Sequence, residues 1–491
     1  MSTKLLSEEI PIREQRLGSI TGFKGTVREL IAAQPSCPLR NSDRCFSQAS
    51  SCMSASVQSY LSEINDAIIV NHAPVGCAVD SVGDNALVKW SEKARGWKDW
   101  TPRNIGFFST NMSMEDTVFG ATEKLKETIR EAYRRYQPKA IFITASCVTA
   151  IIGEDIQSAL DELKKEIPIP LAPVYCEGFK TRIWATGRDM GFHAILTNIV
   201  KPPRFKTNKV NMFNFHASAR VEITEMFARL GLEPVFLVAQ TSVEEISRIS
   251  EAVASVSVCG TLSTYVEDTL EKLYGVPAVK GLHPTGIAGL ESWLRGLAKV
   301  VGKEEEAELV LQEQREKYGP ALEKLREKLK GRTVILGMGP GFAHDYVRTF
   351  KELGMEVLWA TAWHYDQNFD DGSYPDATLK LIEDKIDVPI SVCDLQSFEM
   401  LNLVNKLRPD IYVARHGGTS GWVAKMGIPS IMVTDEYFSF GYKGTVNFGN
   451  TILDKLANRS RERNIAKWMK LPYTDWWLKQ NSFEFLQQEE Q

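Results

Sequence analysis

Five of the eight cysteines in this chain follow short apolar stretches. The cysteines stand at 37, 45, 52, 77, 147, 176, 259 and 393. The five that follow such stretches are Cys77, Cys147, Cys176, Cys259 and Cys393. A thiol at the end of a strand can bind a soft metal, as iron–sulfur clusters, copper(I) and zinc sites do, or serve as a small core residue. No CxxC pair occurs, which argues against a zinc ribbon or a thioredoxin motif.

Two histidines and a glycine-rich turn occupy comparable positions. His364 in TAWHYDQN and His416 in VARHGG each follow a strand-like run, and each is either a site residue or a structural histidine. The turn GMGPGF (337–342) joins a strand to a helix. It lacks the GxGxxG spacing and the P-loop lysine, so a tight turn is favoured over a phosphate site.

The stretches that carry these residues alternate between strand and helix. The clearest series runs from TVILGMG through DYVRTFKELG, EVLWAT, DATLKLIEDK, ISVCD and SFEMLNLVNKL to DIYVARH. This alternation predicts an α/β fold with three doubly wound, Rossmann-like parallel-sheet domains. The predicted segments are an N-terminal arm (1–45) and domains at 46–205, 206–320 and 321–491. Ligands bind such sheets beyond the carboxyl ends of the strands, where the five cysteines stand.

Composition narrows the class of protein. A net charge of -4 argues against a nucleic-acid-binding protein. The sequence contains no run of 18 apolar residues, so we expect no membrane span. The charged start does not resemble a signal peptide. We therefore expect a cytoplasmic protein with reduced thiols. The charged stretch at 303–330 predicts a solvated helix that acts as a spacer, and WMKLPYTDWWLKQ predicts a tail that packs on a partner or on the body.

A set of motifs occurs in a fixed order along the chain. They are NHAPVGC, MEDTVFGATEKL, SCVTAIIGEDI, CEGFK, VCGTLSTYVEDTLEKLYGVP, ELGMEV and KMGIPS. Over residues 45–475 this set resembles the α subunit of the nitrogenase component 1 proteins. The resemblance implies that Cys52, Cys77 and Cys147 hold half of a P-cluster-type [8Fe-7S] cluster shared with a β-type (K-like) subunit. Three thiolates are too few for an all-cysteine eight-iron cluster, which fits an interface position.

The same resemblance assigns Cys259 to a second metal site. Cys259 matches the cysteine that binds the buried catalytic cofactor, an [8Fe-9S-C]-type cluster. The histidine that holds the far end of that cofactor in nitrogenases has no counterpart, since Thr434 stands at its place. Asp435 or Glu436 could supply an oxygen ligand there.

Two further departures concern the reactive face. Nitrogenases carry a Gln and two His after the CEGF motif, whereas here Phe192 replaces the first His and only His193 remains. A phenyl ring cannot deliver a proton, which argues against dinitrogen chemistry. The lysine expected to bind the organic acid falls near Gly417. These differences predict a cofactor without molybdenum and homocitrate.

The departures resemble the nitrogenase-like methylthio-alkane reductases. Such an enzyme would cleave the C–S bond of small thioethers, for example dimethyl sulfide to methane and methanethiol. The resemblance implies an α2β2 heterotetramer and an ATP-dependent iron protein with a [4Fe-4S] cluster. Trp184 and Trp363 would make the site less polar, and His364, His193 and Gln367 are candidates for proton supply or substrate contact.

Three other functions are alternatives to this one. Cofactor-assembly scaffolds are similar to nitrogenase α subunits, keep the relay cysteines and also lack the histidine ligand. A tetrapyrrole reductase of the dark chlorophyll type would pair with an iron protein but has no buried cofactor, and the Cys259 match argues against it. A structural protein with incidental cysteines would not explain the ordered motifs.

Overall fold

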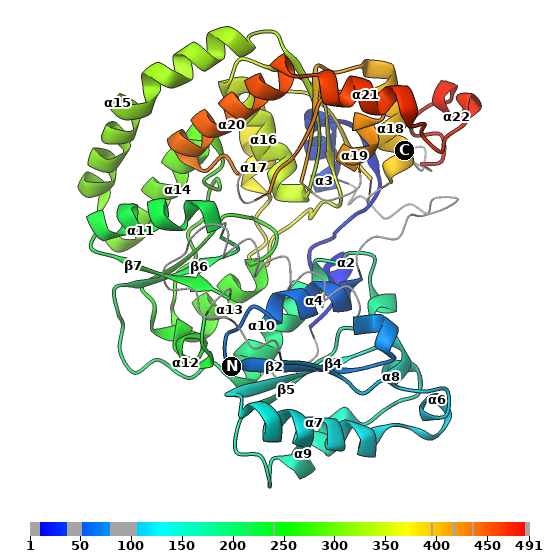
Figure 1. Cartoon of the computed structure of the whole chain (residues 1–491). Helices are drawn as coiled ribbons and strands as arrows, with labels where there is room; N and C mark the ends of the chain where they lie inside the picture. Colours follow the sequence, from blue (N-terminus) through cyan, green and yellow to red (C-terminus); the bar gives the residue numbers. More distant parts are fainter. Residues whose placement is uncertain are drawn as a thin grey trace.

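Three β-sheets organise the described part of the chain (Figure 1). The computed structural model describes residues 10–36, 52–78, 106–215, 217–238, 241–393, 396–415, 419–434 and 437–486. Cys37, Cys45, His416, Gly417, Asp435 and Glu436 lie outside these residues. Each sheet falls within one predicted domain, apart from one strand of the third sheet that comes from the N-terminal segment. The predicted α/β class with parallel sheets is confirmed, while the exact domain boundaries stay a prediction.

The first sheet has the strand order β3-β2-β4-β5, and all its pairs are parallel. Its strands are β2 (Ala67–His72), β3 (Gly106–Ser109), β4 (Ala140–Ala145) and β5 (Leu171–Val174). Successive residues of a strand point to opposite faces. Ile69 and Phe142 accordingly pack on α4 (Met53–Leu61) and α10 (Thr186–Asn198), while Ile68 and Ile141 pack on α7 (Thr122–Tyr136) and α9 (Ile156–Leu163). Figure 1 shows α7 and α9 beneath this sheet.

The second sheet is small and parallel, with the order β7-β6-β8. It consists of β6 (Lys209–Phe213), β7 (Glu233–Leu237) and β8 (Ala254–Ser257). The helix α13 (Thr264–Tyr274) follows β8 through a short loop that contains Cys259. Cys259 therefore lies between a buried strand and the helix that returns along the sheet.

The third sheet has the order β1-β11-β10-β9-β12-β13. Its strands are β1 (Phe23–Thr26), β9 (Thr333–Met338), β10 (Glu356–Ala362), β11 (Pro389–Val392), β12 (Ile411–Ala414) and β13 (Ser430–Met432). All pairs are parallel except β1 with β11. Alternate faces pack on α16 (Pro340–Glu352) and on α18 (Ser397–Leu407) with α19 (Thr419–Ala424). The five parallel strands have the order of a Rossmann fold.

The strand orders predict where ligands bind. In a doubly wound sheet the crevice opens where neighbouring strands send their connections to opposite faces. These switch points lie between β2 and β4, between β6 and β8, and between β9 and β12. The loops that leave these strands carry Cys77, Cys147, Cys259 and Arg415.

The long charged helix forms as the sequence predicted and exposes most of its residues to solvent, but it is not a free spacer. It forms α15 (Glu304–Leu329), and one side of it is buried. Val310, Leu311, Leu322 and Leu325 belong to the largest hydrophobic core, together with residues of α14 (Gly286–Val301) and α20 (Gly441–Ala457). The prediction of a spacer was wrong because the charges dominate the composition while a sparse apolar stripe decides the packing.

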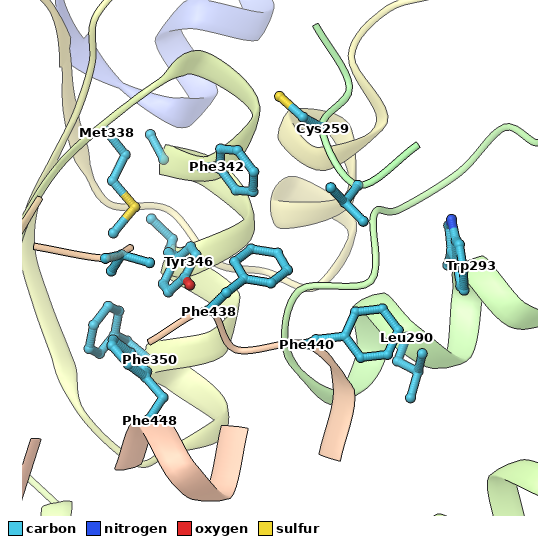
Figure 2. Packing of buried hydrophobic residues seen from close by; sticks show 14 of the residues in the cluster. Cys259, Leu290, Trp293, Met338, Phe342, Tyr346, Phe350, Phe438, Phe440 and Phe448 are labelled. Carbon is cyan, nitrogen blue, oxygen red and sulfur yellow. The ribbon is translucent and has the colours of Figure 1, made fainter. Parts of the chain in front are cut away.

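The largest core joins the second and third sheets. Around α16 it is rich in aromatic rings, and Phe342, Tyr346, Phe438 and Phe448 contact one another at centroid distances of 5.6–6.5 Å. Figure 2 shows Cys259 at the edge of this cluster, on the side of Phe342. No helix among the described residues is long and apolar enough to cross a membrane.

The N-terminal segment is ordered from residue 10 to residue 36 and links distant parts of the chain. It forms α2 (Arg13–Arg16), β1 and α3 (Val27–Ser36). Arg13 is fully buried and donates from Nε and Nη2 to Asp189 of α10, at 2.6 and 2.8 Å, and from Nη1 to Asp366 at 3.2 Å. Arg16 pairs with Asp189 at 2.8 Å and also with Asp370. This cluster of charges connects the first sheet's helices to the loop after β10.

Substituting Arg13 by alanine tests this connection. The change leaves Asp189 and Asp366 buried with less positive charge nearby, and breaking a buried pair in this way costs about 3–5 kcal/mol. We expect Arg13→Ala to lower the midpoint of chemical denaturation strongly. Arg28→Ala is the control, because Arg28 pairs with Asp387 at the surface with 65% of its side chain exposed, and such pairs contribute about 0–1 kcal/mol. Equal effects of the two changes would contradict a structural role for the cluster.

Candidate functional site

Three cysteines lie at the carboxyl edge of the first sheet. Cys77 lies in a single helical turn (Val75–Ala78) just after β2, and Cys147 is the first residue of α8 (Cys147–Ile151), just after β4. Cys52 precedes α4 as its N-cap residue. Each thiol stands on a short segment that follows a buried strand or begins a buried helix. The buried elements therefore fix the backbone position of each cysteine.

The geometry brings the three thiols together. A Cβ added at Gly178, in the turn after β5, would overlap the sulfur of Cys52 and lie 3.8 Å from that of Cys147. The pKa of the Cys77 thiol is raised by burial and by the nearby charges of Cys147 and Cys52. A cation between the thiols would remove that repulsion, as metal binding to thiolates does.

Local hydrogen bonds fix the helix N-termini at which Cys52 and Cys147 stand. The backbone N–H of Ser54 donates to Cys52 Sγ at 3.3 Å. Ser146 and Thr149 form a capping box at the start of α8, which fixes the backbone beside Cys147. Backbone N–H groups at a helix N-terminus stabilise negative charge, so this arrangement favours thiolate ligands.

A fourth thiol, Cys176, lies behind the three. It is fully buried and contacts the carbonyl of Ala145 at 3.3 Å and Ser54 Oγ at 3.7 Å. Burial raises the pKa of this thiol, and the charges of Cys52 and Cys147 add to the effect. Cys176 is thus a neutral, buried neighbour of the thiol group.

The surroundings of the three thiols fit a cluster that another chain completes. Cys52 and Cys77 are exposed and Cys147 is half-buried. Among the described residues no group of three His, Cys, Asp or Glu side chains surrounds a single metal ion. Large apolar side chains at the same edge of the sheet are more than half exposed, which is typical of an interface. They are Val75, Met114, Val118, Phe119, Ile151 and Phe179.

Cys259 occupies a different, buried environment. Only 5% of the residue is exposed. Its backbone N–H donates to Ser257 Oγ at 3.1 Å, and its sulfur lies 3.8 Å from Thr261 Oγ1. The turn at the start of α16 packs against the next residue, since a Cβ at Gly341 would lie 3.5 Å from the nitrogen of Gly260. The second and third sheets therefore meet at this thiol.

Two arginines bring positive charge to the neighbourhood of Cys259. Burial raises the pKa of its thiol, and the guanidinium of Arg415 opposes this rise. Arg415 donates to the carbonyl of Val433 at 3.3 Å and lies over the ring of Phe342 at 4.8 Å. Arg188 lies over the Tyr60 ring at 4.1 Å, and its pKa is lowered by burial although the charge of Cys259 acts against this.

These groups fit a bound anion such as an iron–sulfur cofactor with a thiolate ligand. Arg188 Nε is buried and has no hydrogen-bond partner among the described residues. A buried cation is costly unless negative charge lies nearby; the charges of Glu63 and Cys259 act on Arg188, and a bound anion would add to them. Cys259 supplies a soft ligand, and Arg188 and Arg415 supply compensating charge.

His364 is buried and neutral at neutral pH. Burial lowers its pKa to about 3, and Arg13 contributes to the shift. Neither ring nitrogen has a hydrogen-bond partner among the described residues, and Nε2 lies 3.8 Å from Asp366 Oδ1. The Trp184 ring meets it edge-on at 6.4 Å. At neutral pH His364 can therefore bind a ligand or donate one hydrogen bond, but it carries no charge.

The other predicted side chains, those of His193, Phe192 and Gln367, have different partners. His193 Nδ1 bonds to the hydroxyl of Tyr265 at 2.8 Å. Phe192 packs in the core between Tyr60 and Phe213, at 5.1 and 5.4 Å. Gln367 donates to the carbonyl of Gly18 at 2.7 Å, so its amide holds the N-terminal segment.

Thr434 is half-buried, directly after Val433, whose carbonyl binds Arg415. Its own carbonyl accepts from the N–H of Tyr437 at 3.1 Å. Glu436 belongs to the residues that the structure does not describe. Thr434 thus lies near the positive side of the Cys259 environment.

Sequence inspection missed several residues of the site. Gly178, Arg188 and Arg415 were not singled out, although Gly178 stands in CEGFK and Arg415 directly follows β12. The position after a central strand was a usable signal for Arg415. Arg188 offered none, because its approach to Cys259 depends on the packing of α10 against the second sheet.

Comparisons with known proteins identify the family and the fold of the chain. A family model described as nitrogenase component 1 type oxidoreductase matches residues 52–457. The nitrogenase molybdenum-iron protein alpha chain of Methanosarcina barkeri is 27% identical over 448 residues, covering 79% of this chain and 82% of that protein. The nitrogenase iron-molybdenum cofactor biosynthesis protein NifE of Methanococcus maripaludis is 25% identical over 457 residues, covering 89% and 90%. The solved structure of nitrogenase Cp1 at pH 6.5 shares the fold with a TM-score of 0.70 at 20% identity, covering 96% of this chain and 100% of that one.

Replacing Gly178 by alanine tests the thiol group. The added methyl would overlap the sulfur of Cys52 and displace it from Cys147. After anaerobic reconstitution of the chain with ferrous iron and sulfide, we expect Gly178→Ala to bind less than half as much iron as the unaltered chain, and Cys52→Ser to show the same loss. Gly421→Ala is the matched control, since no atom lies within 4 Å of the added Cβ. Full iron binding by Gly178→Ala would contradict a shared cluster.

Proposed function

The chain belongs to the nitrogenase component 1 type oxidoreductases, and we propose that it is the catalytic α-type subunit of a nitrogenase-like reductase that cleaves C–S bonds of small methylthio-alkanes. The observation that carries the proposal is the combination of a retained, buried Cys259 with an altered reactive face, where Phe192 packs into the core. The proposed reaction is CH3–S–CH3 + 2 e⁻ + 2 H⁺ → CH4 + CH3SH, in which one C–S bond breaks and one C–H and one S–H bond form.

Electrons would enter at the exposed edge of the first sheet. Cys52, Cys77 and Cys147 supply three thiolates there, and the apolar side chains around them suit the docking of other chains. We propose that a β-type subunit completes a P-cluster-type [8Fe-7S] cluster at this edge, within an α2β2 heterotetramer. An ATP-dependent iron protein with a [4Fe-4S] cluster would supply the electrons.

Reduction would take place beside Cys259. A bound [8Fe-9S-C]-type cofactor without molybdenum and homocitrate would store the electrons there. The Cys259 thiolate would bind it, Arg188 and Arg415 would balance its charge, and Thr434 and Glu436 stay candidates for contact with its far end.

The aromatic side chains support an uncharged substrate. Trp363 is 1% exposed, and Trp184 contacts the neutral ring of His364. A neutral imidazole beside an indole ring suits a thioether better than a charged molecule, because it offers a hydrogen bond without a charge. We propose that His364 contacts the substrate, whereas the bonds of His193 to Tyr265 and of Gln367 to Gly18 suggest positioning roles for these two.

A cofactor-assembly scaffold is the second candidate. The similarity to NifE of Methanococcus maripaludis covers 89% of the chain, and such a protein would share the relay cysteines. It would bind a cofactor precursor and release it to an acceptor, whereas an enzyme retains its cofactor through turnover.

Anaerobic turnover separates these functions. The chain is purified with its β-type partner, iron and molybdenum are counted, and the iron protein, ATP and dimethyl sulfide are added. We expect about sixteen irons per αβ pair, the sum of two eight-iron clusters, no molybdenum, and ATP-dependent formation of methane and methanethiol. Cluster binding without turnover, together with transfer of the cofactor to an apo acceptor, would show a scaffold and contradict the proposal.

Cys259→Ser tests the second metal site in the same assay. The variant should keep about half of the iron and lose turnover, because the relay cluster does not involve this residue. Cys393→Ser is the matched control, since Cys393 is an equally buried thiol at the end of β11, and it should keep both iron and activity. Equal iron content in Cys259→Ser and the unaltered protein would contradict the assignment.

A further inference from the structure

A pocket opens beside the Cys259 loop. It is lined by α13, by the segment 278–283 and by the loop 369–376, and its lining includes Gly260, Glu267 and His283. Most of its ionisable side chains are acidic, and its one lysine, Lys280, pairs with Asp371. The pocket therefore brings solvent and negative charge close to the residue that follows Cys259.

His283 lies at the inner side of this pocket. A Cβ added at Gly260 would overlap Cε1 of His283 and lie 3.0 Å from Nε2, so only glycine leaves room for the imidazole beside the Cys259 loop. On its other edge, Nδ1 lies 3.5 Å from Asp345 Oδ2. The ring thus connects the pocket, the Cys259 loop and α16.

Asp345 continues the line inward. It lies on α16, is 2% exposed, and neither carboxylate oxygen accepts a hydrogen bond from the described residues. Its negative charge acts on the thiol of Cys259. A buried carboxyl group that accepts no hydrogen bond from the described residues, with a histidine at 3.5 Å, is placed to receive a proton from that histidine.

Glu267 of α13 lines the same pocket as His283. Its Oε2 accepts from Ser263 Oγ at 3.1 Å, while Oε1 is buried without a partner. Burial raises the pKa of Glu267 to about 7, and the charge of His283 opposes the rise while that of Glu271 adds to it. A carboxyl group that titrates near neutral pH both takes up and releases protons readily.

The charges facing His283 favour its protonated form. Burial alone would lower its pKa, but Asp345, Glu267 and Asp376, from α16, α13 and α17 (Asp376–Glu383), outweigh that effect and raise it. Protonated His283, at the pocket, therefore lies beside the carboxyl group of Asp345 on α16.

We propose that Glu267, His283 and Asp345 form the route by which protons enter from the pocket and reach the Cys259 face. The inference rests on the proposed function, which requires two protons for each C–S bond cleaved. It supplies what the altered reactive face lacks, because Phe192 packs in the core and His364 stays neutral. Glu267 takes the proton from solvent, His283 passes it on, and Asp345 releases it beside the cofactor.

Chemical rescue tests the route in the loaded heterotetramer. We expect His283→Ala to lower both thioether cleavage and hydrogen evolution without substrate by about 100-fold, with unchanged iron content. Imidazole, which fits the opened space, should restore severalfold activity, whereas the equally shaped but much weaker base pyrazole should not. Hydrogen evolution needs only protons and electrons, so it tests the proton route even where no thioether is cleaved. Glu267→Gln should lower the rate and increase the solvent isotope effect, and Glu233→Gln, an acid 61% exposed on β7, should change neither.

The pH dependence of folding stability tests His283 and Glu267 without cofactor or turnover. The folded-state pKa of His283 is raised, so its charge stabilises the fold below its unfolded pKa of about 6.5, and this contribution is lost as pH rises through the folded pKa. The stability difference between the apo protein and His283→Gln should therefore be larger at pH 6 than at pH 9. Glu267→Gln should gain stability relative to the unaltered protein as pH rises through 7, because it removes a carboxyl whose pKa is raised to about 7.

The outcomes separate the route from the function. Full activity in His283→Ala, or loss of activity that imidazole does not restore, would overturn the route while leaving the proposed function intact. If the unaltered protein neither cleaves thioethers nor evolves hydrogen, the proposed function fails. The route is then decided by the stability measurement, where a pH-independent difference overturns it.

Discussion

Parallel strands end on the same edge of a sheet, and this constraint brings the reactive residues of the chain together. A crossover helix leaves the edge on one face or the other, so a crevice opens only where neighbouring connections diverge. The described part of the chain has three such places, and the loops there carry Cys77, Cys147, Cys259 and Arg415. The two thiol environments differ because one edge is exposed, whereas the second and third sheets close over the other.

The buried charges around Arg13 hold this arrangement in place. Asp189 belongs to a helix on the first sheet, and Asp366 follows a strand of the third, so the guanidinium connects two bodies that share no strand. Arg188 is the neighbour of Asp189, and His364 lies two residues before Asp366. The residues that bind Arg13 are therefore close in sequence to the candidate site residues Arg188 and His364.

Much of the fold followed from the sequence, since strict alternation of strand and helix predicts parallel sheets. The positions of Cys77, Cys147 and Cys259 at strand ends were also visible, because that signal is local. The pairing of Glu267 with His283 and Asp345 was not, since three elements distant in sequence must pack before the residues meet. The burial of α15 escaped prediction for a similar reason: its apolar stripe is sparse, and only α14 and α20 show what covers it.

The antiparallel pairing of β1 with β11 has a consequence for the order of folding. Phe23 pairs with Val392, so a strand made near the start of synthesis has its partner only when most of the chain exists. At about 5–20 residues per second, this wait is on the order of tens of seconds. During that time Arg13 has no Asp366 to bind. The third sheet and the contact between the first and third sheets therefore close late, after the earlier sheets have had time to form on the ribosome.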